Sequence, residues 1–89
     1  MRAVITVIGK DMVGILASIS GICAEANVNI SDVTQSILQD MFCMIMMVDI
    51  AQSRIPFAEL SKQLKEKGEG MGVAVNIMHE DIFNSMHRI

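Results

Sequence analysis

The segment from Met41 to Ile50 constrains the fold most, because every residue in it except Asp49 is apolar. Its ten residues match the length of a β-strand and fall well short of the ~20 that a membrane-spanning helix needs. Such a run predicts a central strand with apolar side chains on both faces. The sheet that contains it must therefore be covered on both faces.

The N-terminal part of the chain predicts a strand followed by a helix. Residues 3–8 are mostly β-branched and end at Gly9, as strands often do. Apolar residues at helical spacing predict a helix from Met12 to Ala26, with Asp11 as its N-cap. Gly21 lies inside this helix, and close packing on a sheet would explain a glycine there.

The segment from Ile30 to Leu38 alternates in a way that predicts a half-exposed strand near a sheet edge. The alternation places Ile30 on one face together with Asp32, Thr34 and Ser36. The other face then carries Ser31, Val33, Gln35 and Ile37.

The second half of the chain repeats the pattern of helix and strand. Pro56 suits the first position of a second helix, and Gly68–Gly72 is expected to end it. Val73 to Met78 predicts a fourth strand. Residues 79–89 predict a short amphipathic C-terminal helix.

This order of elements predicts one domain over residues 1–89, of the α+β class. We expect a ferredoxin-like βαββαβ sandwich, with a four-stranded antiparallel sheet, two helices on one face and a short C-terminal helix. Right-handed crossovers would place the first and third strands at the centre, and we expect these two strands to run parallel to one another. The second face of the sheet would be covered by another subunit, edge to edge or back to back, giving a homodimer or a higher homo-oligomer.

Composition argues against several classes of partner. The net charge is −3, the basic residues are scattered, and tryptophan and tyrosine are absent, so we expect no nucleic-acid binding. No apolar run is long enough for a membrane span, and we expect no membrane partner. Cys23 and Cys43 lie in apolar stretches without C-x-x-C spacing, which favours a reducing compartment and a cytoplasmic location.

The residues suggest no catalytic chemistry. We interpret His79 and His87 as surface histidines and not as metal ligands. Successive residues on a helix point in different directions, so these histidines and their acidic neighbours would not converge on one metal ion. The serines lack an elbow motif and an evident base. We therefore expect no enzyme activity, no catalytic or metal-binding residues and no cofactor.

The loop after the first strand is the remaining candidate for function. The amides of Met12, Val13 and Gly14 would occupy the unsatisfied first turn of the helix, which favours a carboxylate. Gly14 would let a ligand approach closely, and the charge of Asp11 could pair with an ammonium group. The loop thus suits a zwitterion such as an amino acid. An ordinary capped helix with a glycine for packing remains the alternative interpretation.

Two segments, K-D-M-V-G-I-L at residues 10–16 and A-N-V-N-I at residues 26–30, resemble the ACT domain, and the resemblance covers the whole chain. The tail 79–89 is similar to that of short stand-alone ACT proteins of uncharacterised function. The resemblance implies the fold derived above, pairing through the sheets and an amino acid bound at the subunit interface. The ligand contacts that it implies come from Asp11, Met12, Val13, Gly14, Ile15, Asn29 and Ile30.

These inferences leave three hypotheses for function. The first is a stand-alone regulatory domain that senses a small molecule, with an amino acid as the expected ligand, at a homodimer interface. The second is an assembly module without a ligand, which regulates a separate protein. A small enzyme ranks last, because no acid–base or nucleophilic set converges.

Overall fold

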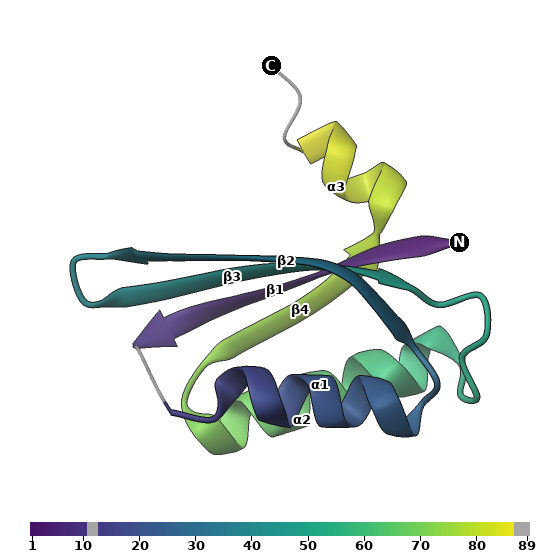
Figure 1. Ribbon diagram of the computed structural model, residues 1–89, viewed down its shortest axis with the longest axis horizontal. Helices are drawn as coiled ribbons and strands as arrows, with labels where there is room; N and C mark the ends of the chain where they lie inside the picture. The colour runs from purple at the N-terminus through teal and green to yellow at the C-terminus, as the bar shows by residue number, and fades with distance from the viewer. Residues whose placement is uncertain (11–12, 87–89) are drawn as a thin grey trace.

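Strands and helices follow one another in the order that the sequence predicts. The structure, a computed structural model, describes residues 1–10 and 13–86. The predicted ferredoxin-like βαββαβ fold with an added C-terminal helix is confirmed (Figure 1). The elements are β1 (Arg2–Lys10), α1 (Ile15–Glu25), β2 (Asn29–Leu38), β3 (Met41–Asp49), α2 (Phe57–Met71), β4 (Ala74–His79) and α3 (Glu80–Met86).

The four strands form one antiparallel sheet in the order β2-β3-β1-β4. The first and third strands are central, as predicted, but the expectation that they run parallel to one another is wrong. A right-handed crossover through α1 makes β1 and β2 parallel and leaves room for one strand between them. The chain returns from β2 through a tight turn, so β3 fills that gap antiparallel to both neighbours.

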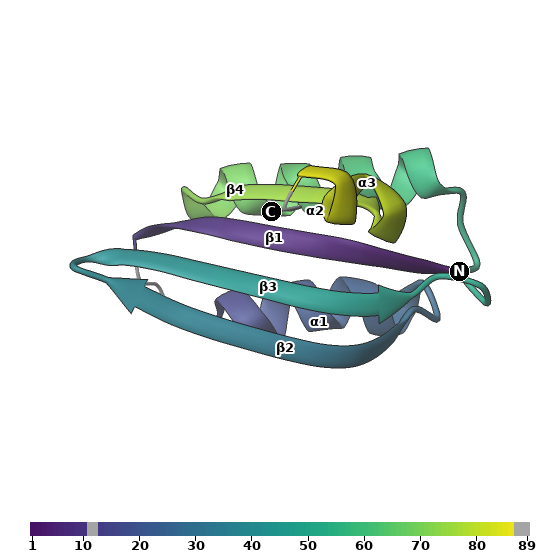
Figure 2. The same ribbon diagram turned by 90° about the horizontal axis from the view of Figure 1, so that it is seen from above.

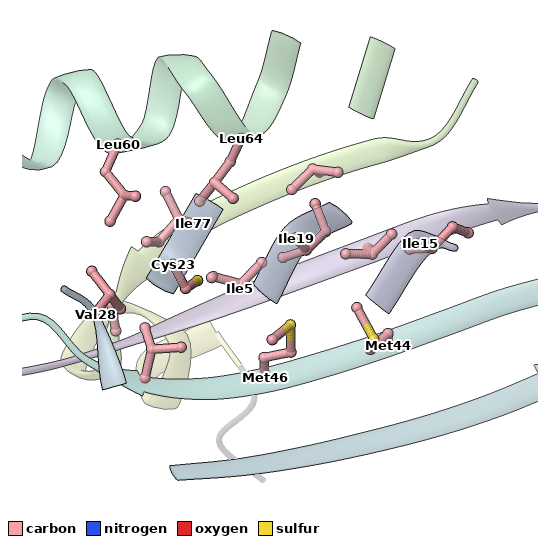
Figure 3. Packing of buried hydrophobic residues seen from close by; sticks show 14 of the residues in the cluster. Ile5, Ile15, Ile19, Cys23, Val28, Met44, Met46, Leu60, Leu64 and Ile77 are labelled. Carbon is pink, nitrogen blue, oxygen red and sulfur yellow. The ribbon is translucent and has the colours of Figure 1, made fainter. Parts of the chain in front are cut away.

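Helices α1 and α2 cover one face of the sheet, and α3 lies on the opposite face, which we call the open face (Figures 1 and 2). The core lies between the sheet and the two longer helices (Figure 3). Its largest fully buried side chains are Ile5, Ile15, Ile19, Met44, Met46, Leu60 and Leu64, with Val7, Val48 and Cys23 among the smaller ones.

Strand β3 is apolar on both faces, as predicted, and only one face is covered within the chain. Phe42, Met44, Met46 and Val48 point toward the helices and are buried. The alternate residues, Met41, Cys43, Ile45 and Met47, point to the open face and stay partly or largely exposed.

The predicted start of the first helix is wrong. Helix α1 begins at Ile15, and its N-cap is Gly14 with φ +88°, not Asp11. A left-handed residue ends the preceding loop, so the helical turn cannot start before it. Asp11 and Met12 lie outside the described residues.

The second helix ends within the predicted segment Gly68–Gly72, but the prediction of Pro56 as its first helical residue is wrong. Helix α2 begins at Phe57 with Pro56 as its N-cap, runs through Gly68, and ends at Met71. Gly72, with φ +75°, is the residue that stops it. The predicted C-terminal helix is present as α3, which ends at Met86. Residues 87–89, including His87, lie outside the described residues.

Close packing is found at other glycines than the predicted one. A Cβ at Gly21 would meet no atom of another described element within 4 Å, so the packing explanation for it is wrong. A Cβ at Gly68 would lie 2.5 Å from Val75 Cγ2, and one at Gly9 would lie 2.5 Å from Val73 Cγ1. These two glycines let α2 and β1 approach the start of β4.

Candidate functional site

The start of α1 presents backbone N–H groups at the surface. Gly14 turns the chain in the left-handed conformation, and its carbonyl accepts a hydrogen bond from the N–H of Ser18 at 2.9 Å. Among the described residues, no side chain caps this end of the helix and no acidic residue lies in its first turn. The free N–H groups and the helix dipole therefore leave a site that suits an anion such as a carboxylate.

A groove of about 540 Å³, which we call the α1 groove, opens beside these groups. It lies between the start of α1 and the neighbouring parts of β2 and β3. Ile15 is buried at its base, whereas Val13 in the preceding loop is fully exposed. The lining residues are Gly14, Ile15, Leu16, Ala17, Ser20, Gln35 and Phe42.

Sequence reasoning missed five residues of the α1 groove: Leu16, Ala17, Ser20, Gln35 and Phe42. The side-chain hydroxyl of Ser20 donates to the carbonyl of Ala17 at 3.2 Å, and Gln35 contributes a side-chain amide from β2. The sequence did contain a pattern that could have identified the orientation of Gln35. The strand alternation places Gln35 on the same face as Val33, which packs on the core. Its nearness to Gly14 depends on the tertiary fold.

Asn29 and Ile30 lie at the other end of the molecule. Asn29 pairs with Asp49 at the start of β2, while Ile30 packs against the core. The eleven residues of α1 separate them from Gly14, a length of about 16 Å. The structure thus brings Val13, Gly14 and Ile15 together, but it does not bring Asn29 and Ile30 to them within one chain.

A carboxylate lies at the Asn29 end of the molecule. The N–H of Ala51 donates to Asp49 Oδ1 at 2.9 Å, and this hydrogen bond lowers the pKa of the Asp49 carboxyl. The charges of the N-terminal ammonium group and Arg2 act in the same direction. Asp49 therefore supplies a negative charge beside Asn29 at neutral pH.

Two further observations bear on chemistry. Within residues 1–10 and 13–86, no three histidine, cysteine, aspartate or glutamate side chains gather closely enough to hold a metal ion. No helix in that part of the chain has the length and hydropathy needed to cross a bilayer.

Comparisons with known proteins match the fold along nearly the whole chain. Residues 2–78 match a family model described as an ACT domain. A UPF0237 protein of Methanocaldococcus jannaschii is 51% identical over 88 residues, covering 99% of this chain and 98% of that protein.

Solved structures give the same picture. An ACT domain protein from Streptococcus pneumoniae superposes with a TM-score of 0.81 and 37% identity, over 98% of both chains. The regulatory subunit of aspartate kinase from Thermus thermophilus superposes with a TM-score of 0.64 and 20% identity, over 86% of this chain and 50% of that one. The second likeness is one of fold alone.

Proposed function

This chain belongs to the ACT domain family, and on that premise we propose that it is a regulatory domain that binds an amino acid between two copies of itself. Its regulatory output passes to a separate protein. The site combines the loop end of α1 in one copy with the start of β2 in the other.

The start of α1, which no side chain of the described residues caps, is the observation that carries this proposal. The carboxylate of the ligand accepts hydrogen bonds from the N–H groups of Leu16 and Ala17, the exposed residues of the first turn. At Gly14, no described residue beyond its chain neighbours has an atom within 4 Å of the position that a Cβ would take, so a ligand has room to approach the backbone there. Val13 belongs to this half of the site, and so do Asp11 and Met12 by their position in the family motif.

A second copy supplies the other half of the site. Strand β2 is an edge strand, and its outer side offers unpaired N–H and C=O groups to another strand. Two-fold antiparallel pairing of two β2 strands brings the Asn29 end of one copy beside the Gly14 end of the other. Asn29, Ile30 and the nearby Asp49 carboxylate of the second copy then face the ammonium group of the ligand.

Thermal unfolding in the presence of each of the twenty amino acids tests the proposal. Binding to the folded state adds RT ln(1 + [L]/Kd), about 2.7 kcal/mol at a hundredfold excess over Kd, which raises the midpoint by several degrees in a domain of this size. We expect such a shift for one or two amino acids. If none of the twenty shifts the midpoint, the proposal is wrong.

Matched variants then locate the ligand. Gln35→Ala changes the α1 groove, and Thr34→Ala changes the adjacent exposed residue on the opposite face of β2. We expect Gln35→Ala and Asn29→Ala each to weaken the shift, and Thr34→Ala to preserve it. A loss caused only by Gln35→Ala would place the ligand in one copy and contradict the shared site.

The ligand-free assembly module stays as the second candidate, and one observation favours it. The hairpin of β2 and β3 extends beyond the helices (Figure 1), and its tip carries Ile37, Leu38 and Met41 exposed by 58%, 68% and 43%. An exposed apolar tip suits a protein contact. Under this alternative, Ile37→Ser with Leu38→Ser abolishes capture of the regulated protein, while no amino acid changes the unfolding midpoint.

A further inference from the structure

The open face of the sheet contains a second cavity, of about 390 Å³, which we call the α3 cavity. Helix α3 contacts β1 and β4, and it leaves β3 and β2 uncovered (Figure 2). Ile8, Cys43, Ile45 and Met78 form most of the floor of the α3 cavity. Phe83 and Met86 of α3 form its wall.

Two polar side chains line this otherwise apolar cavity. Thr6 on β1 pairs with Ile45 on one side and with Asn76 on the other. Both Thr6 and Asn76 line the α3 cavity. The neighbouring open-face positions on β1 are Val4, which is fully buried, and Ile8, which is 49% exposed. The Thr6 hydroxyl thus has apolar neighbours along β1, and the Asn76 amide lies beside it on the exposed edge strand β4.

This arrangement restricts what can fill the cavity. A purely apolar occupant would remove water from the Thr6 hydroxyl and the Asn76 amide without replacing its hydrogen bonds, which costs free energy. The described residues that line the cavity carry no charge, so a charged occupant would lose hydration without gaining an ion pair. The occupant therefore needs to be neutral, with hydrogen-bonding groups on an otherwise apolar body.

The size and the walls of the cavity suit a small molecule. Its volume falls in the ~300–1,000 Å³ range typical of ligand pockets. Met78 and Met86 are flexible side chains that can adapt to different shapes. Helix α3 is held at its base, where Arg2 Nη2 donates to Glu80 Oε1 at 2.8 Å and His79 stacks on Phe57. Met86 at its other end is 65% exposed.

We propose that the α3 cavity binds a neutral small molecule that has an apolar body and an amide, carbonyl, hydroxyl or N–H group placed against Thr6 and Asn76. The α3 cavity and the α1 groove lie on opposite faces of the sheet, so this binding does not depend on the amino-acid site. Pairing of two copies through their β2 edges would leave the open face free for it.

Two dyes with the same ring system test the proposal on the full chain. N-phenyl-1-naphthylamine is neutral and carries an N–H group, whereas 1-anilino-8-naphthalenesulfonate adds a sulfonate to the same skeleton. We expect saturable fluorescence enhancement with the neutral dye at one site per chain, and binding at least about tenfold weaker for the anion. Backbone amide shifts should cluster at Thr6, Cys43 and Asn76.

Variants on one helix provide the matched control. Met86 lines the cavity, and Ile82 on the same helix is 52% exposed without lining it. We expect Met86→Glu and Ile45→Glu to reduce the affinity for the neutral dye at least about tenfold, and Ile82→Glu to leave it unchanged.

Three results would overturn the proposal. One is the absence of saturable binding by the neutral dye, and another is equal or tighter binding of the anionic dye. The third is a wild-type dimer that excludes the dye and becomes a monomer on Ile45→Glu, because a second copy would then occupy the open face.

Discussion

At the scale of single residues, Gly68 and Gly70 on α2 differ in their surroundings although they are two positions apart. A Cβ at Gly68 would lie 2.5 Å from Val75 Cγ2 and 2.9 Å from the carbonyl oxygen of Val73. We expect Gly68→Ala to lower the free energy of unfolding by about 1–3 kcal/mol in urea denaturation, because the helix must move away from β4.

Gly70→Ala is the matched control for that substitution. No atom lies within 4 Å of its Cβ position, and its backbone is helical. Alanine favours the helix by up to about 1 kcal/mol over glycine, so this variant should be more stable than the wild type. Equal losses in the two variants would contradict this prediction, because helix propensity favours alanine at both positions and only Gly68 contacts β4.

Burial of Cys23 predicts a dependence of stability on alkaline pH. Burial raises the pKa of the Cys23 thiol from 9.0 to about 11. The thiol ionises first in the unfolded chain, so its contribution to stability is fully present below pH 9 and is lost as the pH rises to about 11. We expect the free energy of unfolding to fall more steeply across this window in the wild type than in Cys23→Ala.

Cys43→Ala serves as the control for the alkaline window. The chain has no tyrosine, and its lysines are common to all three proteins, so the difference in slope reports on the cysteine that is replaced. Cys43→Ala should keep the steep slope of the wild type. A slope that is the same in all three proteins would contradict the prediction for Cys23.

Residue-scale features were the hardest to predict from the sequence. Asp11 has the side chain of a typical N-cap, but Gly14 occupies that position because the loop ends in a left-handed turn. Gly21 and Gly68 are both glycines inside a helix, and the local sequence does not tell them apart. Only Gly68 lies so close to β4 that a side chain would collide with it. Such differences arise from contacts between segments far apart in the chain.

At the scale of elements, α3 depends on the pairing of Arg2 with Glu80. The guanidinium contacts both carboxylate oxygens, through Nη2 and Nε, and thereby joins the start of β1 to the first residue of α3. We expect Arg2→Ala to reduce local stability by about 0.2–1 kcal/mol, as for other partly exposed ion pairs. Amide hydrogen exchange in residues 80–86 should accelerate, while exchange in β1 and β3 stays unchanged.

Asp81→Asn is the control for α3, because it removes the neighbouring carboxylate in the same first turn. It should leave the exchange of α3 close to that of the wild type. Acceleration of the same size in both variants would show that the charge of the first turn, and not the contact with Arg2, holds the helix.

The order and type of the elements could be predicted because each rests on a local pattern. Within β2, however, a bulge shifts the register between Ile30 and Asp32, so Ile30 joins Val33 against the core. The prediction that Ile30 shares a face with Asp32 is therefore wrong. The loop half of the candidate site follows from local sequence, whereas Gln35 joins it only through the folding of β2 beside α1.

At the scale of the whole molecule, the proposed pairing of β2 edges predicts a change of mass. Thr34→Lys with Ser36→Lys places charge on exposed positions of the β2 edge, and lysine at an edge opposes strand pairing. We expect the double variant to sediment as a monomer at concentrations where the wild type is a dimer, with dimer affinity at least about tenfold weaker.

The opposite edge of the sheet provides the control. Ala74→Lys with Asn76→Lys places the same charges on exposed positions of β4, the other edge strand. This variant should remain a dimer. If the β4 variant dissociates and the β2 variant does not, the copies pair through β4. That result would contradict the proposed amino-acid site shared between two copies.

The central position of β1 has a consequence for how the protein is made. Its two neighbours are β3, which ends at Asp49, and β4, which ends at His79. While the ribosome adds the residues between them, β1 and β3 can already pair, but the other edge of β1 stays open to any strand that meets it. The nascent chain can cover this edge of β1 only after β4 has left the exit tunnel. Until then, the exposed edge of β1 is the part of the chain that a chaperone would bind.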